Sequence, residues 1–217
     1  MMSSSVTGFV ANGALAWTSV GPWGPIACVM GAVEAASALV SRLLADGSLG
    51  HIPHLHAPVG SPVPLRHLED WEMRTLVGPP PPLVAGVDVV PVDDAAAIKA
   101  VLAAALPHSS SRPGDNGVRG WYGVRDADGS LLAVGADRSA NGVGNLVGIA
   151  VRPDAWGRGL GAAVTAAMTA RLHAEFGAVV LGVSVGNDRA VALYDRLGFT
   201  DTLLRGSYDG PAARRRG

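Results

Sequence analysis

The chain has 217 residues, with 17 Lys or Arg against 18 Asp or Glu, so its formal net charge is -1. This balance excludes binding to nucleic acid or to an anionic membrane through bulk charge. A hydrophobic fraction of 48% excludes wholesale disorder, and the single cysteine, Cys28, excludes an intramolecular disulfide and a cysteine-rich metal site.

The N-terminal segment ends at four consecutive prolines, residues 79–82. Such a run cannot continue a helix and favours an extended conformation, so we predict a domain boundary there and a first segment at residues 1–82. Its composition predicts three stretches: a helix at 26–45 that contains Cys28, an irregular Pro-rich stretch at 51–64, and a strand at 70–77.

The second segment, residues 83–210, has clearer signals and is followed by a tail at 211–217 that we expect to be disordered. Asp93 and Asp94 precede an Ala-rich stretch and are suitable helix caps. Between 160 and 176 an apolar residue recurs at every fourth position, which predicts one buried helix face. The predicted order is β-α-β-β-β-α-β-α-β, with strands at 86–92, 118–125, 130–138, 145–151, 178–185 and from 199, and helices at 95–106, 160–176 and 187–197.

A glycine-rich turn, residues 156–161, joins the strand at 145–151 to the long helix. Backbone N–H groups of such a turn lie at the positive end of the helix dipole, point the same way and bind phosphate. Gly157, Gly159 and Ala162 fit the Rossmann fingerprint, but the next strand ends without the acidic residue that holds the ribose. A P-loop is excluded because no Gly-Lys-Ser/Thr follows. The third interpretation is a coenzyme A pyrophosphate site.

Residues 146–199 resemble the GCN5-related N-acetyltransferase (GNAT) superfamily. The family's turn is usually Gln/Arg-x-x-Gly-x-Gly/Ala, whose last two glycines correspond to Gly159 and Gly161, whereas its first position is Trp156 here. The other matching residues are Val151-Arg152-Pro153, Asn187, Ala190, Leu193-Tyr194 and Leu197-Gly198-Phe199. The resemblance covers roughly residues 83–208. It implies an α/β (α+β) fold with a mixed, mostly antiparallel central sheet flanked by helices.

The resemblance also implies an N-acetyltransferase that moves an acyl group from acetyl-CoA to an amine by direct attack in a ternary complex. In such enzymes Tyr194 would protonate the departing thiolate, and Asn187 would hydrogen-bond the pantetheine arm while also capping its helix. The remaining coenzyme A contacts implied by the resemblance are the backbone near Ile149 and Val151, and the turn residues Gly157, Arg158, Gly159, Leu160, Gly161 and Ala162.

The general base is not identified by sequence. The strand at 145–151 contains no Glu, and Asp137, His108 and Asp115 stay as candidates. The missing carboxylate keeps a second interpretation open, in which the protein is a non-catalytic acyl-CoA sensor.

Partners and location follow from the remaining features. The acceptor is expected to be a small-molecule or peptide amine, and no nucleic acid, membrane or metal partner is expected. His51, His54 and His56 have no matching fourth ligand. We expect a cytoplasmic protein, and exposed strands are compatible with a homodimer. Residues 1–82 are interpreted as a truncated, degenerate GNAT-like unit that does not bind coenzyme A and shapes the acceptor side.

Overall fold

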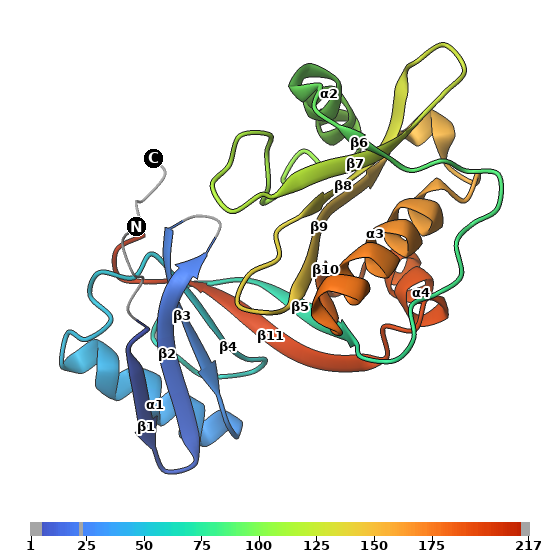
Figure 1. Ribbon diagram of the computed structural model, residues 1–217. Helices are drawn as coiled ribbons and strands as arrows, with labels where there is room; N and C mark the ends of the chain where they lie inside the picture. Colours follow the sequence, from blue (N-terminus) through green and yellow to red (C-terminus); the bar gives the residue numbers. More distant parts are fainter. Residues whose placement is uncertain (1–5, 22–23, 214–217) are drawn as a thin grey trace. The chain divides into compact units, whose positions relative to one another are not determined.

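A computed structural model describes residues 6–21 and 24–213 and divides the chain into two compact units (Figure 1). Unit 1 contains the residues up to 72, residues 184–186 and the residues from 203 onward, and unit 2 contains residues 73–183 and 187–202. The division therefore does not fall at the prolines of residues 79–82, because strand pairing joins segments that are remote in sequence. Of the tail expected at 211–217, residues 214–217 lie outside the described residues.

Unit 1 is a sheet with one helix, α1, on one face (Figure 1). Its elements are β1 (Gly8–Ala11), β2 (Ala14–Gly21), β3 (Gly24–Met30), α1 (Val33–Ala45) and β4 (His54–Pro58). Strands β1, β2 and β3 pair antiparallel, β3 pairs parallel with β4, and β4 pairs antiparallel with β11 (Asp201–Asp209). Leu39, Val40 and Leu43 of α1 pack against Val29 and Leu55 of the sheet.

Two predictions for unit 1 are wrong. Residues 26–30 are not helical but form most of β3, so Cys28 lies in a strand, and Gly31, with φ +133°, separates that strand from α1. Residues 54–58 are not irregular but form β4, which buries Leu55 and Ala57 in a period of two. Both segments pair with a strand on each side, and this pairing outweighs their local composition.

Unit 2 has the strand order β5-β10-β9-β8-β7-β6. Helix α2 packs on one face of this sheet, and α3 and α4 pack on the other (Figure 1). The elements are β5 (His67–Leu76, whose last four residues belong to unit 2), β6 (Val90–Val92), α2 (Ala95–Ala105), β7 (Gly120–Arg125), β8 (Leu131–Asp137), β9 (Gly144–Val151), η1 (Pro153–Ala155), α3 (Leu160–Phe176), β10 (Val179–Ser184) and α4 (Asp188–Arg196).

The mixed, mostly antiparallel sheet flanked by helices confirms the predicted fold class. The helix predicted at 160–176 has those bounds, and the Asp94 side chain accepts hydrogen bonds from the N–H groups of Ala96 and Ala97, as its capping role requires. The strand expected at 86–92 is limited to Val90–Val92, because Gly86, with φ +73°, lies in a turn. No helix in the described part of the chain is long and apolar enough to cross a membrane.

Candidate functional site

Strand β9 contains a bulge at Gly148, where φ is +62°. The register of β8 against β9 shifts at this point. Before the bulge Leu146 points to the α3 side of the sheet, and after it Ile149 and Val151 point to that same side, so the normal alternation is interrupted once. The bulge therefore turns the side chains of Ile149 and Val151 to the α3 side of the sheet. These are the two residues whose backbone groups the family resemblance implies as contacts of the pantetheine arm.

Beyond Leu146, strand β9 leaves its parallel partner β10. The register runs from Gly144 opposite Val179 to Leu146 opposite Leu181 and then ends. Residues 147–151 consequently have no β10 partner for the backbone groups on that edge. The Val151 carbonyl already accepts a hydrogen bond of 2.8 Å from the Trp156 indole Nε1. Its second lone pair stays available for another donor.

The glycine turn, residues 156–161, connects β9 through η1 to the start of α3. Gly157 and Gly159 have φ values of +79° and +76°, and Gly159 is the N-cap of α3. A Cβ atom at either position would meet nothing within 4 Å, so the turn is open on that side. Left-handed residues next to a helix N-terminus direct consecutive N–H groups to one point, which is an anion-binding geometry.

Side chains around the glycine turn add positive charge. Arg158 Nη1 lies 3.7 Å from a carboxylate oxygen of Asp126, and its side chain is half exposed. The Arg189 guanidinium of α4 lies 4.9 Å from the centre of the Trp156 ring. Trp156, which replaces the family's Gln or Arg, thus holds an arginine of another element beside the turn.

Helix α4 places Asn187 and Tyr194. Asn187 is its N-cap, and Oδ1 accepts from the N–H of Ala190 at 3.2 Å. Tyr194 is 6% exposed, packs edge-on against Phe199 and has its pKa raised to about 12 by burial. The buried Arg74 guanidinium anchors this helix, since it pairs with the α4 carboxylate of Asp195 and donates to the Phe199 carbonyl at 3.1 Å.

The three candidate bases differ in their surroundings. Asp137 is buried, accepts hydrogen bonds from the backbone and hydroxyl of Ser139, and lies 3.5 Å from Arg119 Nη1. Asp115 accepts a hydrogen bond from the Arg112 N–H within its loop, and His108 is exposed. Asp137 and Asp115 therefore have structural partners, and none of the three lies on β9.

Sequence reasoning missed the bulge itself. A Cβ atom at Gly148 would lie 3.3 Å from Cη2 of Trp121 and 3.6 Å from the Ser109 hydroxyl, so these two residues border the bulge on the α2 side. A single glycine inside a strand is a known sign of a bulge or a close approach. That signal was present in residues 145–151.

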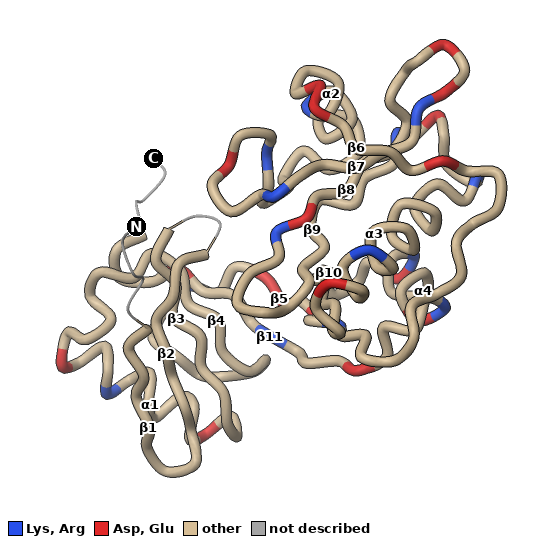
Figure 2. Tube along the Cα trace, in the orientation of Figure 1, with Lys and Arg blue, Asp and Glu red and all other residues tan. Residues whose placement is uncertain are grey.

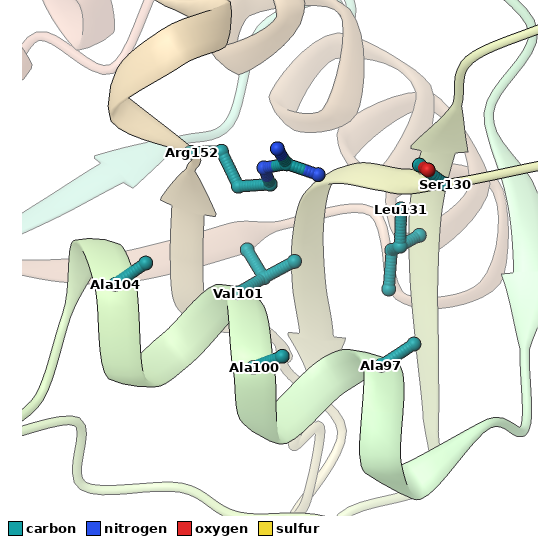
Figure 3. A pocket seen from close by; sticks show the side chains of 7 residues that line it. All are labelled: Ala97, Ala100, Val101, Ala104, Ser130, Leu131 and Arg152. Atoms are coloured by element: carbon teal, nitrogen blue, oxygen red, sulfur yellow. The ribbon is translucent and has the colours of Figure 1, made fainter.

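A separate shallow pocket of about 260 Å³ lies along α2 (Figure 3). The Arg152 guanidinium at its rim is paired with Asp154, with Nε at 3.0 Å from Oδ1. The pocket contains none of the predicted site residues, and its lining consists of Ala97, Ala100, Val101, Ala104, Ser130, Leu131 and Arg152. Within the described residues, no group of three or more His, Cys, Asp or Glu is placed to hold a metal ion.

Comparison with known proteins identifies sequence relatives of this chain. The family model described as FR47-like protein matches residues 121–205. The chain is 31% identical over 199 residues to a mycothiol acetyltransferase of Streptomyces coelicolor, covering 80% of this chain and 64% of that protein. It is 33% identical over 147 residues to a mycothiol acetyltransferase of Streptomyces avermitilis, covering 58% and 48%. The chain thus spans less than two thirds of the length of either relative.

Solved structures agree on the fold. A putative GNAT-family acetyltransferase from Novosphingobium aromaticivorans matches with a TM-score of 0.62 and 23% identity, over 93% of this chain and 89% of that one. A GCN5-related N-acetyltransferase from Kribbella flavida matches with a TM-score of 0.59 and 19% identity, over 95% and 90%. These two structures share the fold of this chain, and the FR47-like family model matches its residues 121–205.

Proposed function

We propose that unit 2 binds acetyl-CoA along the free edge of β9 and at the glycine turn, and transfers the acetyl group to an amine. The observation that carries this proposal is the combination of a bulged strand that leaves its parallel partner with an open, left-handed glycine turn directly after it. The backbone of Ile149 and Val151 would bind the pantetheine arm together with Asn187. The pyrophosphate would bind to Gly157, Arg158, Gly159, Leu160, Gly161 and Ala162.

The reaction is direct attack in a ternary complex. The amine nitrogen attacks the thioester carbonyl, the C–N bond forms, the C–S bond breaks and the thiolate leaves. A phenol whose pKa is about 12 is a weak acid toward a thiolate whose conjugate thiol has a pKa of ~8.5, and complete proton transfer would be unfavourable by about 5 kcal/mol. Tyr194 therefore stabilises the leaving thiolate as a hydrogen-bond donor, and the thiolate takes its proton from solvent.

The attacking amine must be neutral, and its nitrogen releases one proton to solvent as the amide forms. Because β9 carries no carboxylate and Asp137 is held by Ser139 and Arg119, we propose that the amine reaches the site already neutral. The rate at low acceptor concentration should then rise with pH up to the pKa of the acceptor itself. The acceptor of the mycothiol acetyltransferases is the first one to test, since two relatives carry that name.

The second candidate function is an acyl-CoA sensor without turnover. Two observations favour it: β9 has no carboxylate that could act as a general base, and Tyr194, the proposed donor to the thiolate, is only 6% exposed. The two functions share the coenzyme A site and differ in chemistry.

Calorimetric titration with acetyl-CoA, followed by a thiol-release assay over a panel of amines, separates these functions. We expect binding and, with at least one amine, thiol release together with the mass of the acetylated product. Binding without release on any amine would favour the sensor. Absence of binding to wild-type protein would overturn both.

We also propose that unit 1 is a degenerate copy of the unit that binds coenzyme A. Both units contain two parallel strands connected through a helix, β3-α1-β4 and β9-α3-β10. In unit 1 only residues 31–32 separate strand from helix, whereas residues 152–159 do so in unit 2. The short connection has no room for a phosphate-binding turn. We therefore expect one coenzyme A per chain in the titration, and two would contradict the proposal.

A further inference from the structure

The face of the unit 1 sheet opposite α1 carries a straight row of polar and aromatic side chains. The strand register places Trp17 opposite Cys28, Cys28 opposite His56, and His56 opposite Ser207. Directly opposed residues point to the same face of a sheet, and the neighbouring Leu55 packs on the α1 side. We call Trp17, Cys28, His56 and Ser207 the polar row.

Hydrogen bonds connect His56 to Ser207 and, through the Ser207 hydroxyl, to Trp71. The Trp71 indole can only donate, and it does so to the Ser207 hydroxyl at 3.0 Å. The one hydrogen of that hydroxyl is then available for His56 Nδ1, also 3.0 Å away. Burial and the nearby Arg205 charge lower the pKa of His56 to about 4. The imidazole is therefore neutral at pH 7. In the tautomer whose Nδ1 accepts from the Ser207 hydroxyl, Nε2 carries the proton and is a donor.

Arg205 supplies a buried positive charge beside the polar row. It is 5% exposed, and Nη2 donates to the His56 carbonyl at 2.9 Å. Within residues 6–21 and 24–213 no carboxylate forms an ion pair with it, and Glu69 and Asp70 of β5 bond to other side chains. Strands β1 to β4 contain no charged residue (Figure 2). A buried guanidinium without a counter-charge is unfavourable, and a ligand can provide that charge.

We propose that the polar row and Arg205 bind a small molecule through a carboxylate group. A guanidinium binds a carboxylate with two parallel hydrogen bonds, and His56 Nε2–H is a neutral donor for the same anion. The half-buried indoles of Trp17 and Trp71 are suited to the apolar part of such a molecule. One buried positive charge matches a monoanion, whereas a phosphate dianion would keep an uncompensated charge.

This site lies within unit 1 and does not depend on acyl transfer in unit 2. Cys28 makes it directly testable, because it is the only cysteine of the chain and belongs to the polar row. Iodoacetate and iodoacetamide alkylate a thiol in the same way, with an S–C bond formed and iodide released. They differ in that only iodoacetate carries a carboxylate.

The experiment measures both alkylation rates of Cys28 by intact mass, in the folded protein and in urea, at constant ionic strength. We expect the ratio of the iodoacetate rate to the iodoacetamide rate to be at least about tenfold higher in the folded chain than in urea. Arg205→Met should abolish this increase. Arg66→Met removes an exposed arginine of the same unit, paired with Asp209, and should keep it.

Competition keeps the proposal falsifiable if Arg205→Met does not fold. Propionate should protect Cys28 of the wild-type protein from iodoacetate, and propionamide should not. An unchanged ratio, protection by both compounds, or no labelling of the folded protein would overturn the proposal. Stronger protection by inorganic phosphate than by propionate would overturn the assignment to a carboxylate.

Discussion

Gly148 is the residue on which the shape of β9 depends, and Gly148→Ala tests its role. An alanine there would keep φ near +62° only under strain, and its Cβ would lie 3.3 Å from the Trp121 ring. The left-handed conformation costs a residue with a Cβ about 1–2 kcal/mol. For a chain of this size that corresponds to a decrease of about 2–8 °C in Tm.

The variant can relieve this strain by leaving the left-handed region, which removes the bulge. The backbone groups of Ile149 and Val151 would then turn away from the free edge of β9. Two net hydrogen bonds to the pantetheine arm are worth about 1–3 kcal/mol, so we expect the Kd for acetyl-CoA to rise about 5- to 150-fold. Isothermal titration calorimetry measures this Kd, and differential scanning calorimetry measures the Tm.

Gly177→Ala is the matched control. Gly177 has φ +74°, and a Cβ atom there would meet nothing within 4 Å. Gly177 is the C-cap of α3, about 25 Å along the helix from the glycine turn at its N-terminus. The variant should lower the Tm to a similar extent and leave the Kd unchanged. Equal Kd values for Gly148→Ala and the wild type, with the Tm lowered, would refute the link between the bulge and coenzyme A binding.

Three further variants address single side chains. Tyr194→Phe removes the proposed donor to the thiolate and should lower kcat about 10- to 100-fold with little change in the calorimetric Kd for acetyl-CoA. The folded-state pKa of His56, about 4, is below its unfolded value of ~6.5. Its contribution to the free energy of unfolding is therefore complete above pH 6.5 and decreases by at most about 3 kcal/mol as the pH falls toward 4. His56→Gln should flatten this pH dependence of the unfolding free energy, measured by urea titration. Arg74→Met leaves the Phe199 carbonyl without its partner and should lower the unfolding free energy by about 1–3 kcal/mol, against less than about 1 kcal/mol for the exposed Arg66→Met.

Each of these variants has an outcome that contradicts its reasoning. Wild-type kcat in Tyr194→Phe would remove the phenol from the mechanism. An unchanged pH dependence in His56→Gln would assign it to other groups. Equal losses in Arg74→Met and Arg66→Met would show that burial of the first guanidinium has no energetic weight.

Unit 2 could be predicted in detail because its signals are local. The apolar stripe at 160–176, the Asp94 cap and the Asn187 cap each depend on residues within a few positions of one another. The glycine turn is likewise contained in six consecutive residues. These features need no knowledge of the partner strands.

The remaining features depend on partners that sequence does not reveal. Residues 26–30 are a strand because β2 and β4 pair with them, and the bulge at Gly148 is defined by the register of β8. The pKa of Tyr194 is set by its burial among residues from several elements. The charge of Arg205 is conspicuous only once its burial is known.

Strand β11 has a consequence for the order in which the chain is made. Its residues 205–209 pair with β4, and Tyr208 belongs to the core beneath α1. The sheet that contains β1 to β4 is therefore completed by residues that are translated long after those strands. Until then the edge of β4 is exposed, which makes this interval the stage at which the nascent chain is most open to chaperones and to mispairing.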